Sequence, residues 1–158
     1  MNNSSILIDH TAMKVSQMAI IALNILAFVL NAPWLAAAVT GVMLLGTVAG
    51  VPGFGFIYRY ALKPLGLAKA HVIEDNPEPH RFAQGFGALV MLLGTLALYG
   101  AMPLLGWSLV WLVTALAALN ALGGFCAGCF VYYWLARFHV PGFRKHPPAG
   151  TFPGMRPG

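Results

Sequence analysis

The stretch from Phe82 to Ala136, FAQGFGALVMLLGTLALYGAMPLLGWSLVWLVTALAALNALGGFCAGCFVYYWLA, contains no Asp, Glu, Lys or Arg. A transmembrane helix needs about 20 consecutive, mostly apolar residues, so this stretch is long enough for two membrane spans joined by a turn. Gly and Pro residues between Gly100 and Trp107 mark the turn. The stretch therefore predicts two membrane-spanning helices, at about 82–101 and about 107–138.

A second stretch without charges, Val15–Tyr58, has the same organisation. Asn31 and Pro33 mark its turn, so the predicted spans are about 14–31 and about 34–62. Hydrophobic residues make up 59% of the chain and charged residues only 8%, whereas a soluble domain has about 25% charged residues. Together, the two stretches predict an all-α integral membrane protein, a four-transmembrane-helix bundle in a lipid bilayer.

The charged residues lie outside these stretches, around Lys14, between Arg59 and Arg81, and from Arg137 onward. Four spans would place all three clusters on one side of the membrane. Because Lys and Arg are enriched in cytoplasmic segments, we expect both termini in the cytoplasm. The Lys and Arg residues do not form the basic stripe of a nucleic-acid-binding protein, so no nucleic-acid partner is predicted.

The predicted membrane domain covers residues 1–140, and a tail of residues 141–158 follows it. The tail is rich in Pro and Gly, a composition that favours an extended, disordered segment when it stands alone. Docking on a partner in a larger assembly is the alternative.

Two pairs of matching segments indicate that the bundle consists of two duplicated helical hairpins. Lys14–Gln17 (KVSQ) matches Arg81–Gln84 (RFAQ), and Gly50–Tyr58 matches Gly124–Tyr132 at the ends of the second and fourth spans. Interrupted helices at matching positions of two repeats are typical of a binding site, and tight helix crossing through small residues is the alternative. The residues that interrupt these two spans are Gly50, Pro52, Gly53 and Gly55 in one, and Gly123, Gly124 and Gly128 in the other.

The two cysteines, Cys126 and Cys129, share one face of the fourth predicted helix. Counted back from Arg137 along a continuous helix, they lie about 16 Å and about 12 Å inside the membrane. Three alternatives remain: inert packing as small apolar residues, thiol redox or persulfide chemistry, and ligation of a metal or cofactor. A closed zinc site needs four ligands and the histidines lie in the flanks, so no metal site is predicted.

Other polar and aromatic residues border the predicted spans. Gln17, Gln84 and Tyr133 are candidates for the lining of a cytoplasmic vestibule below the cysteines; hydrogen bonding between helices is the alternative for the glutamines. His80 and His139 could ligate a haem axially, although flanking histidines are also ordinary interfacial residues. No other cofactor is predicted.

Three short segments of the chain resemble those of a known family of membrane proteins. The chain resembles a bacterial family of small four-span membrane proteins of unknown function, through Asp9–Gln17 (DHTAMKVSQ), Arg81–Gln84 (RFAQ) and Cys126–Phe130 (CAGCF). The resemblance covers about residues 8–142; Lys14 stands where the family has Arg, and Ala83 where it has Asn. It implies a location in the bacterial inner membrane and an association with thioredoxin-like and sulfur-transfer proteins.

The sequence leaves three functional hypotheses and does not decide whether the protein is an enzyme. The leading one is a membrane thiol–disulfide or sulfane-sulfur relay through Cys126 and Cys129. The second is a non-catalytic accessory subunit of a larger membrane protein complex. The third is a transporter of a small sulfur species, which would need an oligomer because four helices form a narrow bundle.

Overall fold

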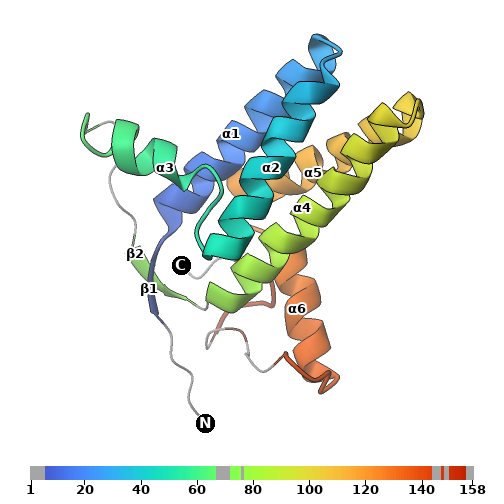
Figure 1. The fold of residues 1–158 in the computed structure, drawn as a ribbon. Helices are drawn as coiled ribbons and strands as arrows, with labels where there is room; N and C mark the ends of the chain where they lie inside the picture. Colours follow the sequence, from blue (N-terminus) through green and yellow to red (C-terminus); the bar gives the residue numbers. More distant parts are fainter. Residues whose placement is uncertain (1–5, 67–71, 76, 144–146, 148–149, 156–158) are drawn as a thin grey trace.

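The computed structural model describes residues 6–66, 72–75, 77–143, 147 and 150–155. These residues form six helices, one of them a single turn, together with one π-helical turn and two short strands (Figure 1). In chain order they are β1 (Ile6–Asp9), α1 (His10–Val29), α2 (Pro33–Ala49), α3 (Gly55–Ile57), η1 (Tyr58–Leu62), β2 (Val72–Asp75), α4 (Pro77–Tyr99), α5 (Pro103–Gly123) and α6 (Ala127–Arg137).

Two helical hairpins, α1–α2 and α4–α5, form the body of the molecule, and their turns lie at the same end of it (Figure 1). The turns are built alike. Asn31 and Ala101 adopt positive φ values of 47° and 58°, and Pro33 and Pro103 then begin the second helix of each hairpin, where the missing proline N–H costs nothing. These likenesses agree with a repeated hairpin, although the duplication itself stays a prediction.

The hairpins pack through α2 against α4 and through α1 against α5. Their common core contains Val39, Met91 and Val110, all almost completely buried. Two polar pairs link the hairpins inside this core. Asn24 Nδ2 donates to Thr114 Oγ1 at 3.0 Å, and the Thr40 and Thr95 hydroxyls lie 3.0 Å apart. Such bonds satisfy polar groups that have no access to water.

The predicted helix 34–62 is not continuous. Gly50 ends α2 in the left-handed conformation, with φ at 71°. The chain then folds back along α2, where a Cβ on Gly46 would lie 2.5 Å from the Cα of Gly53. The segment that follows, α3 and η1, lies to the side of the bundle (Figure 1). Gly50 and Pro52 explain the break, because one favours the left-handed conformation and the other lacks an N–H for the helix.

The predicted helix 107–138 is also interrupted. Gly124 caps α5 with φ at 66°, and α6 begins at Ala127 beside the first turns of α4. The break lies just before Cys126, and the stretch on which the depth estimate for the cysteines rests, Ala127–Arg137, is helical; their depth in a membrane stays a prediction. Cys126 and Cys129 lie at the end of the bundle, level with the beginning of α4.

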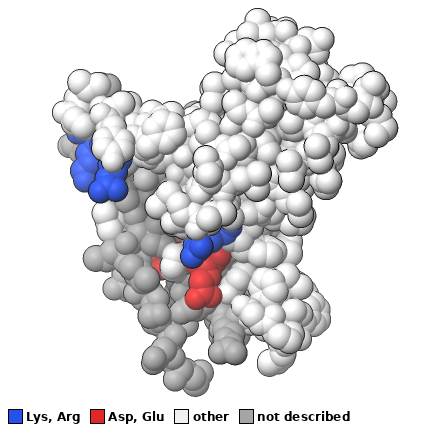
Figure 2. Space-filling view, in the orientation of Figure 1, with Lys and Arg blue, Asp and Glu red and all other residues white. Residues whose placement is uncertain are grey.

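Three helices, α1, α4 and α5, are long and apolar enough to cross a membrane, and α2 is a shorter apolar helix. Large apolar side chains cover the outside of the bundle, including Leu45, Val48, Leu96 and Leu104. On the face that Figure 2 shows, the described Lys, Arg, Asp and Glu side chains lie at η1, to the side of the bundle, and around the beginning of α4, and none of them lies at the hairpin turns. The protein is thus a helical membrane protein. The count of four membrane spans and the cytoplasmic location of both termini stay predictions.

A small antiparallel ribbon was not predicted. β1 pairs with β2, with Ile6 opposite Asp75 and Asp9 opposite Val72. The ribbon brings the segment before α1 next to the segment before α4. It therefore fixes where both hairpins begin.

Candidate functional site

The site is centred on the break between α5 and α6. Cys126 is the N-cap residue of α6, and its sulfur accepts a hydrogen bond from the backbone N–H of Cys129 at 3.1 Å. Cys126 and Cys129 form a disulfide, with their Cα atoms 5.2 Å apart. Both side chains are buried. The disulfide thus lies at a helix N-terminus, where backbone N–H groups and the helix dipole stabilise a thiolate once the bond is reduced.

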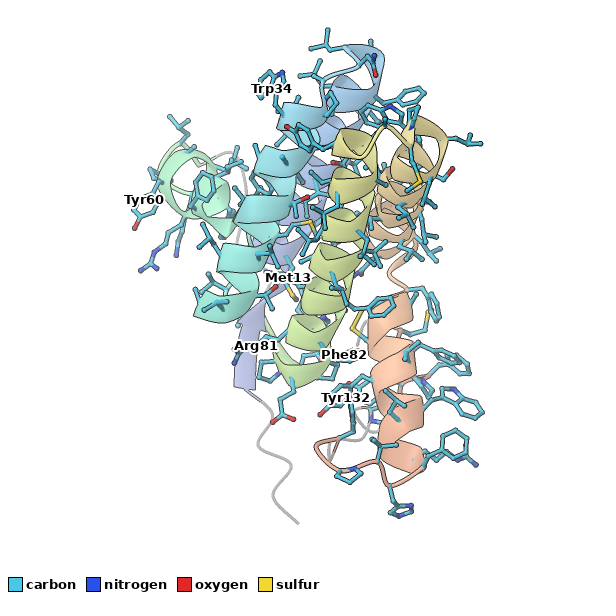
Figure 3. All side chains as sticks on the ribbon, turned by 45° about the vertical axis from the view of Figure 1, so that its right-hand side comes forward. Met13, Trp34, Tyr60, Arg81, Phe82 and Tyr132 are labelled. Carbon is cyan, nitrogen blue, oxygen red and sulfur yellow. A yellow bond between two sulfur atoms is a disulfide. The ribbon has the colours of Figure 1, made fainter. Side chains whose placement is uncertain are left out.

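A histidine from another helix contacts the disulfide. His80, in the first turn of α4, places Nδ1 3.5 Å from the sulfur of Cys129. The contact depends on the close approach of α6 to α4, where a Cβ on Gly128 would lie 2.5 Å from the Cβ of Ala83. A glycine is therefore required at this crossing. Nearby, Tyr132 donates a hydrogen bond to Glu78 at 2.9 Å, and Phe82 and Tyr132 lie between α4 and α6 (Figure 3).

A buried carboxylate orients this histidine. Oδ2 of Asp75, at the end of β2, lies 2.8 Å from His80 Nε2 and 3.2 Å from His10 Nε2. A carboxylate can only accept hydrogen bonds, so the neutral tautomer that donates to Asp75 is the one with its proton on Nε2. Nδ1 of the neutral ring is then an acceptor that faces Cys129. Once the disulfide is reduced, the order Asp75–His80–Cys129 would be the arrangement of a carboxylate, a general base and a thiol.

The same residues can be assessed as metal ligands. His80, Cys126 and Cys129 offer ligand atoms within 4.8 Å of one another, and so do His10, Asp75 and His80. Thiolates, not disulfide sulfurs, bind zinc. The first group could therefore hold a metal only after reduction of the disulfide.

Two cavities adjoin the disulfide. The larger has a volume of about 440 Å³ and lies between α1, α4, α5 and the α5–α6 break. The smaller, of about 20 Å³, lies between the disulfide, His10 and Asp75. Met13, Gln17, His80, Asn120 and Cys126 line both, so the disulfide is in reach of the larger cavity.

The three predicted vestibule residues all lie near the disulfide. Gln17 lines both cavities, and its buried Oε1 has no hydrogen-bond partner among the described residues. Gln84 lines the larger cavity and donates to the carbonyl oxygens of Met43 at 3.3 Å and Val51 at 3.2 Å. It thereby ties α4 to the end of α2. Tyr133 is buried and lines the smaller cavity.

The described part of the tail, residues 150–155, packs on the disulfide segment of its own chain. The Cys126 N–H donates to the carbonyl oxygen of Gly154 at 2.7 Å, and Phe125 forms a β-bridge with Met155. The rings of Phe130 and Phe152 stack with their centroids 6.2 Å apart. In this chain these residues do not stand alone, because the disulfide segment and α6 offer them backbone and aromatic partners; disorder of the isolated tail stays a prediction.

The two predicted haem ligands are not brought together. His80 lies beside Cys129, near the N-terminus of α6, whereas His139 is exposed just past the C-terminus of that helix. Haem ligation stays an untested prediction.

Sequence reasoning missed His10 and Asp75 as members of the site and did not pair His80 with a cysteine. The separation of these residues along the chain hides their proximity. The signal that could have found them is the likeness of two short segments, Ile6–Asp9 (ILID) and Val72–Asp75 (VIED). Each precedes a helix, and their pairing as strands places both histidines beside the carboxylate.

The fold and the site define a helical membrane protein with a buried Cys-x-x-Cys disulfide at a helix N-terminus. The sequence profile of the family described as Domain of unknown function (DUF4395) matches residues 8–137, so the chain belongs to that family. No curated protein and no solved structure gives a significant match to it.

Proposed function

We propose that this protein is a membrane thiol–disulfide oxidoreductase in which Cys126 and Cys129 alternate between disulfide and dithiol. The observation that supports this most is the disulfide at the start of α6 with the imidazole of His80 against Cys129. The sulfurs of Cys126 and Cys129 are bonded to each other. This bond favours an interpretation as disulfide exchange over the transfer of sulfane sulfur by a single cysteine.

Each cysteine has a different role in the proposed exchange. The sulfur of Cys126 caps α6 and accepts an N–H bond, so Cys126 is the better stabilised thiolate and the cysteine that carries the mixed disulfide. A thiolate of a protein dithiol attacks the sulfur of Cys126, the S–S bond breaks with Cys129 as the leaving group, and a mixed disulfide with Cys126 forms. The second thiolate of that dithiol then resolves it, leaving Cys126 and Cys129 reduced and the partner oxidised.

His80 manages the proton in this cycle. Its Nδ1 faces Cys129, and Asp75 holds the ring in place from the other side. In the reverse direction the imidazole removes the proton of Cys129, and this thiolate displaces the partner from Cys126. A positioned base of this kind contributes about 10²- to 10⁴-fold in rate.

The proposed setting is a four-span bundle in the bacterial inner membrane. α2 completes the bundle; its 17 residues extend about 25 Å, close to the thickness of the hydrocarbon core. The Lys and Arg residues near the disulfide end support a cytoplasmic location for that end, by the positive-inside rule. Because that compartment is reducing, a disulfide on this side would be catalytic rather than structural. The partner is a thioredoxin-like protein.

The redox potential of the disulfide tests the proposal. The purified protein is equilibrated in buffers of defined dithiol-to-disulfide ratio, and its free thiols are tagged with a maleimide. We expect a midpoint above about −300 mV, the range of exchangeable disulfides. The variants Cys126→Ser and Cys129→Ser are the controls that show no two-electron step. Maleimide labelling of the reduced cysteines from either side of sealed vesicles tests the orientation of the protein in the membrane.

A disulfide that stays oxidised well below about −300 mV would be structural and would overturn the proposal. The cysteines would then be packing residues, and the accessory-subunit hypothesis would take its place. In that case the apolar faces of the helices would bind other subunits as well as lipid.

A further inference from the structure

The cavity of about 440 Å³ raises the question of which ligand it accommodates. Its lining comes mainly from apolar residues of α1, α4 and α5, including Ile20, Val90 and Val113. Such a volume is typical of sites for small organic molecules. A catalytic disulfide lies in its wall, because Cys126 is one of the lining residues.

The cavity reaches the outside of the helices at an apolar patch. Three of its lining residues, Phe86, Leu112 and Leu116, are also exposed, by 52%, 49% and 36%. Leu112 lies near the middle of α5, about 14 Å from its beginning at Pro103 and about 17 Å from its end at Gly123. In a membrane-spanning α5 this opening would face the hydrocarbon core. A ligand that enters there must be soluble in lipid.

Polar groups gather at the other end of the cavity, next to the disulfide. Gln17, His80 and Asn120 line the cavity at this end together with Cys126. The amide of Gln17 offers N–H donors, and its oxygen is buried without a partner. An amide can donate to a carbonyl oxygen and accept from a hydroxyl. A group that alternates between these two forms would suit this amide in both states.

We infer that the cavity binds a lipid-soluble quinone, which reoxidises the reduced cysteine pair. The inference rests on the proposed function, since the disulfide must first have been reduced. In the step, the S–H bonds of Cys126 and Cys129 break and the S–S bond forms. The quinone takes up the two electrons and two protons, so its two carbonyl groups become hydroxyl groups. His80 receives the proton of Cys129 and passes it on. Quinones are the membrane oxidants that drive disulfide formation in other systems.

The test uses the reduced full-length protein in lipid nanodiscs and a decyl-substituted ubiquinone, whose fully substituted ring does not add thiols irreversibly. Loss of quinone absorbance and loss of free thiols are followed together. We expect one hydroquinone for each disulfide formed, and none with the Cys126→Ser, Cys129→Ser double variant. Ala117→Phe fills the cavity from α5, and Ala115→Phe makes the same substitution at an exposed position of that helix outside the cavity.

Overfilling a packed site costs about 1–3 kcal/mol, so Ala117→Phe should raise the KM for the quinone about 5- to 150-fold, while Ala115→Phe leaves it unchanged. Equal KM values for both variants would refute the cavity as the binding site, and a quinone that does not oxidise the wild-type dithiol would refute the ligand. Exchange with glutathione is measured in parallel on the same samples. If that exchange proceeds without quinone turnover, this inference fails and the proposed function stands.

Discussion

The tail that covers the disulfide gives the most quantitative prediction. Deleting residues 150–158 removes the hydrogen bond from Cys126 N–H to Gly154, worth about 0.5–1.5 kcal/mol. It also removes the stacked contact between Phe130 and Phe152, worth about 0.5–1.5 kcal/mol. The sum, about 1–3 kcal/mol, stabilises the covered state of the disulfide. Because about 1.4 kcal/mol corresponds to a factor of ten, opening becomes about 5- to 150-fold more frequent.

The assay is the rate at which a charged phosphine reductant cleaves the disulfide in the detergent-solubilised protein. Under conditions where opening is fast, this rate is proportional to the open fraction. The single variant Phe152→Ala should give a smaller increase, about 2- to 12-fold. Phe138→Ala is its control, because Phe138 has a similar exposure and contacts Trp134 at the other end of α6. A deletion variant that is reduced no faster than the wild type would show that the tail does not protect the disulfide.

Three further predictions concern the disulfide site. His80→Asn should slow exchange between the disulfide and glutathione about 10²-fold through loss of the base, and Asp75→Asn should slow it less; equal rates in all three proteins would exclude a proton-transfer role. Cys129→Ala should leave Cys126 able to retain glutathione as a mixed disulfide, seen by mass spectrometry of the intact protein, whereas Cys126→Ala should retain little; the opposite result would reverse the assigned roles. Gly128→Ala should lower the free energy of unfolding by about 1–3 kcal/mol through its clash with Ala83, while Gly123→Ala, whose nearest neighbour is a flexible leucine end, should have a much smaller effect in thermal unfolding.

The helical architecture could be predicted from the sequence because it follows from local properties. Long apolar stretches without charge form helices, and Pro and Gly end them. Two hairpin turns were therefore predicted near Pro33 and Pro103, where the structure has them. Gly50 and Gly124, two of the residues named as interrupting the second and fourth spans, end α2 and α5 in the structure. Apolar composition alone does not show that Gly50 and Gly124 adopt the left-handed conformation that ends a helix.

The candidate site, like the helices, could be predicted only in the part that depends on residues close together in the sequence. Cys126 and Cys129 are close in sequence, so their spacing alone predicted that they share one face of a helix. His10, Asp75 and His80 join them only through tertiary structure: a two-stranded ribbon brings the carboxylate to both imidazoles, and Gly128 lets α6 approach α4. The sequence by itself thus determined the helices, the membrane character and the cysteine pair, because these depend on residues near one another in the chain. Only the fold decided which base, which cavity and which tail residues face that pair, because those contacts join segments far apart in the sequence.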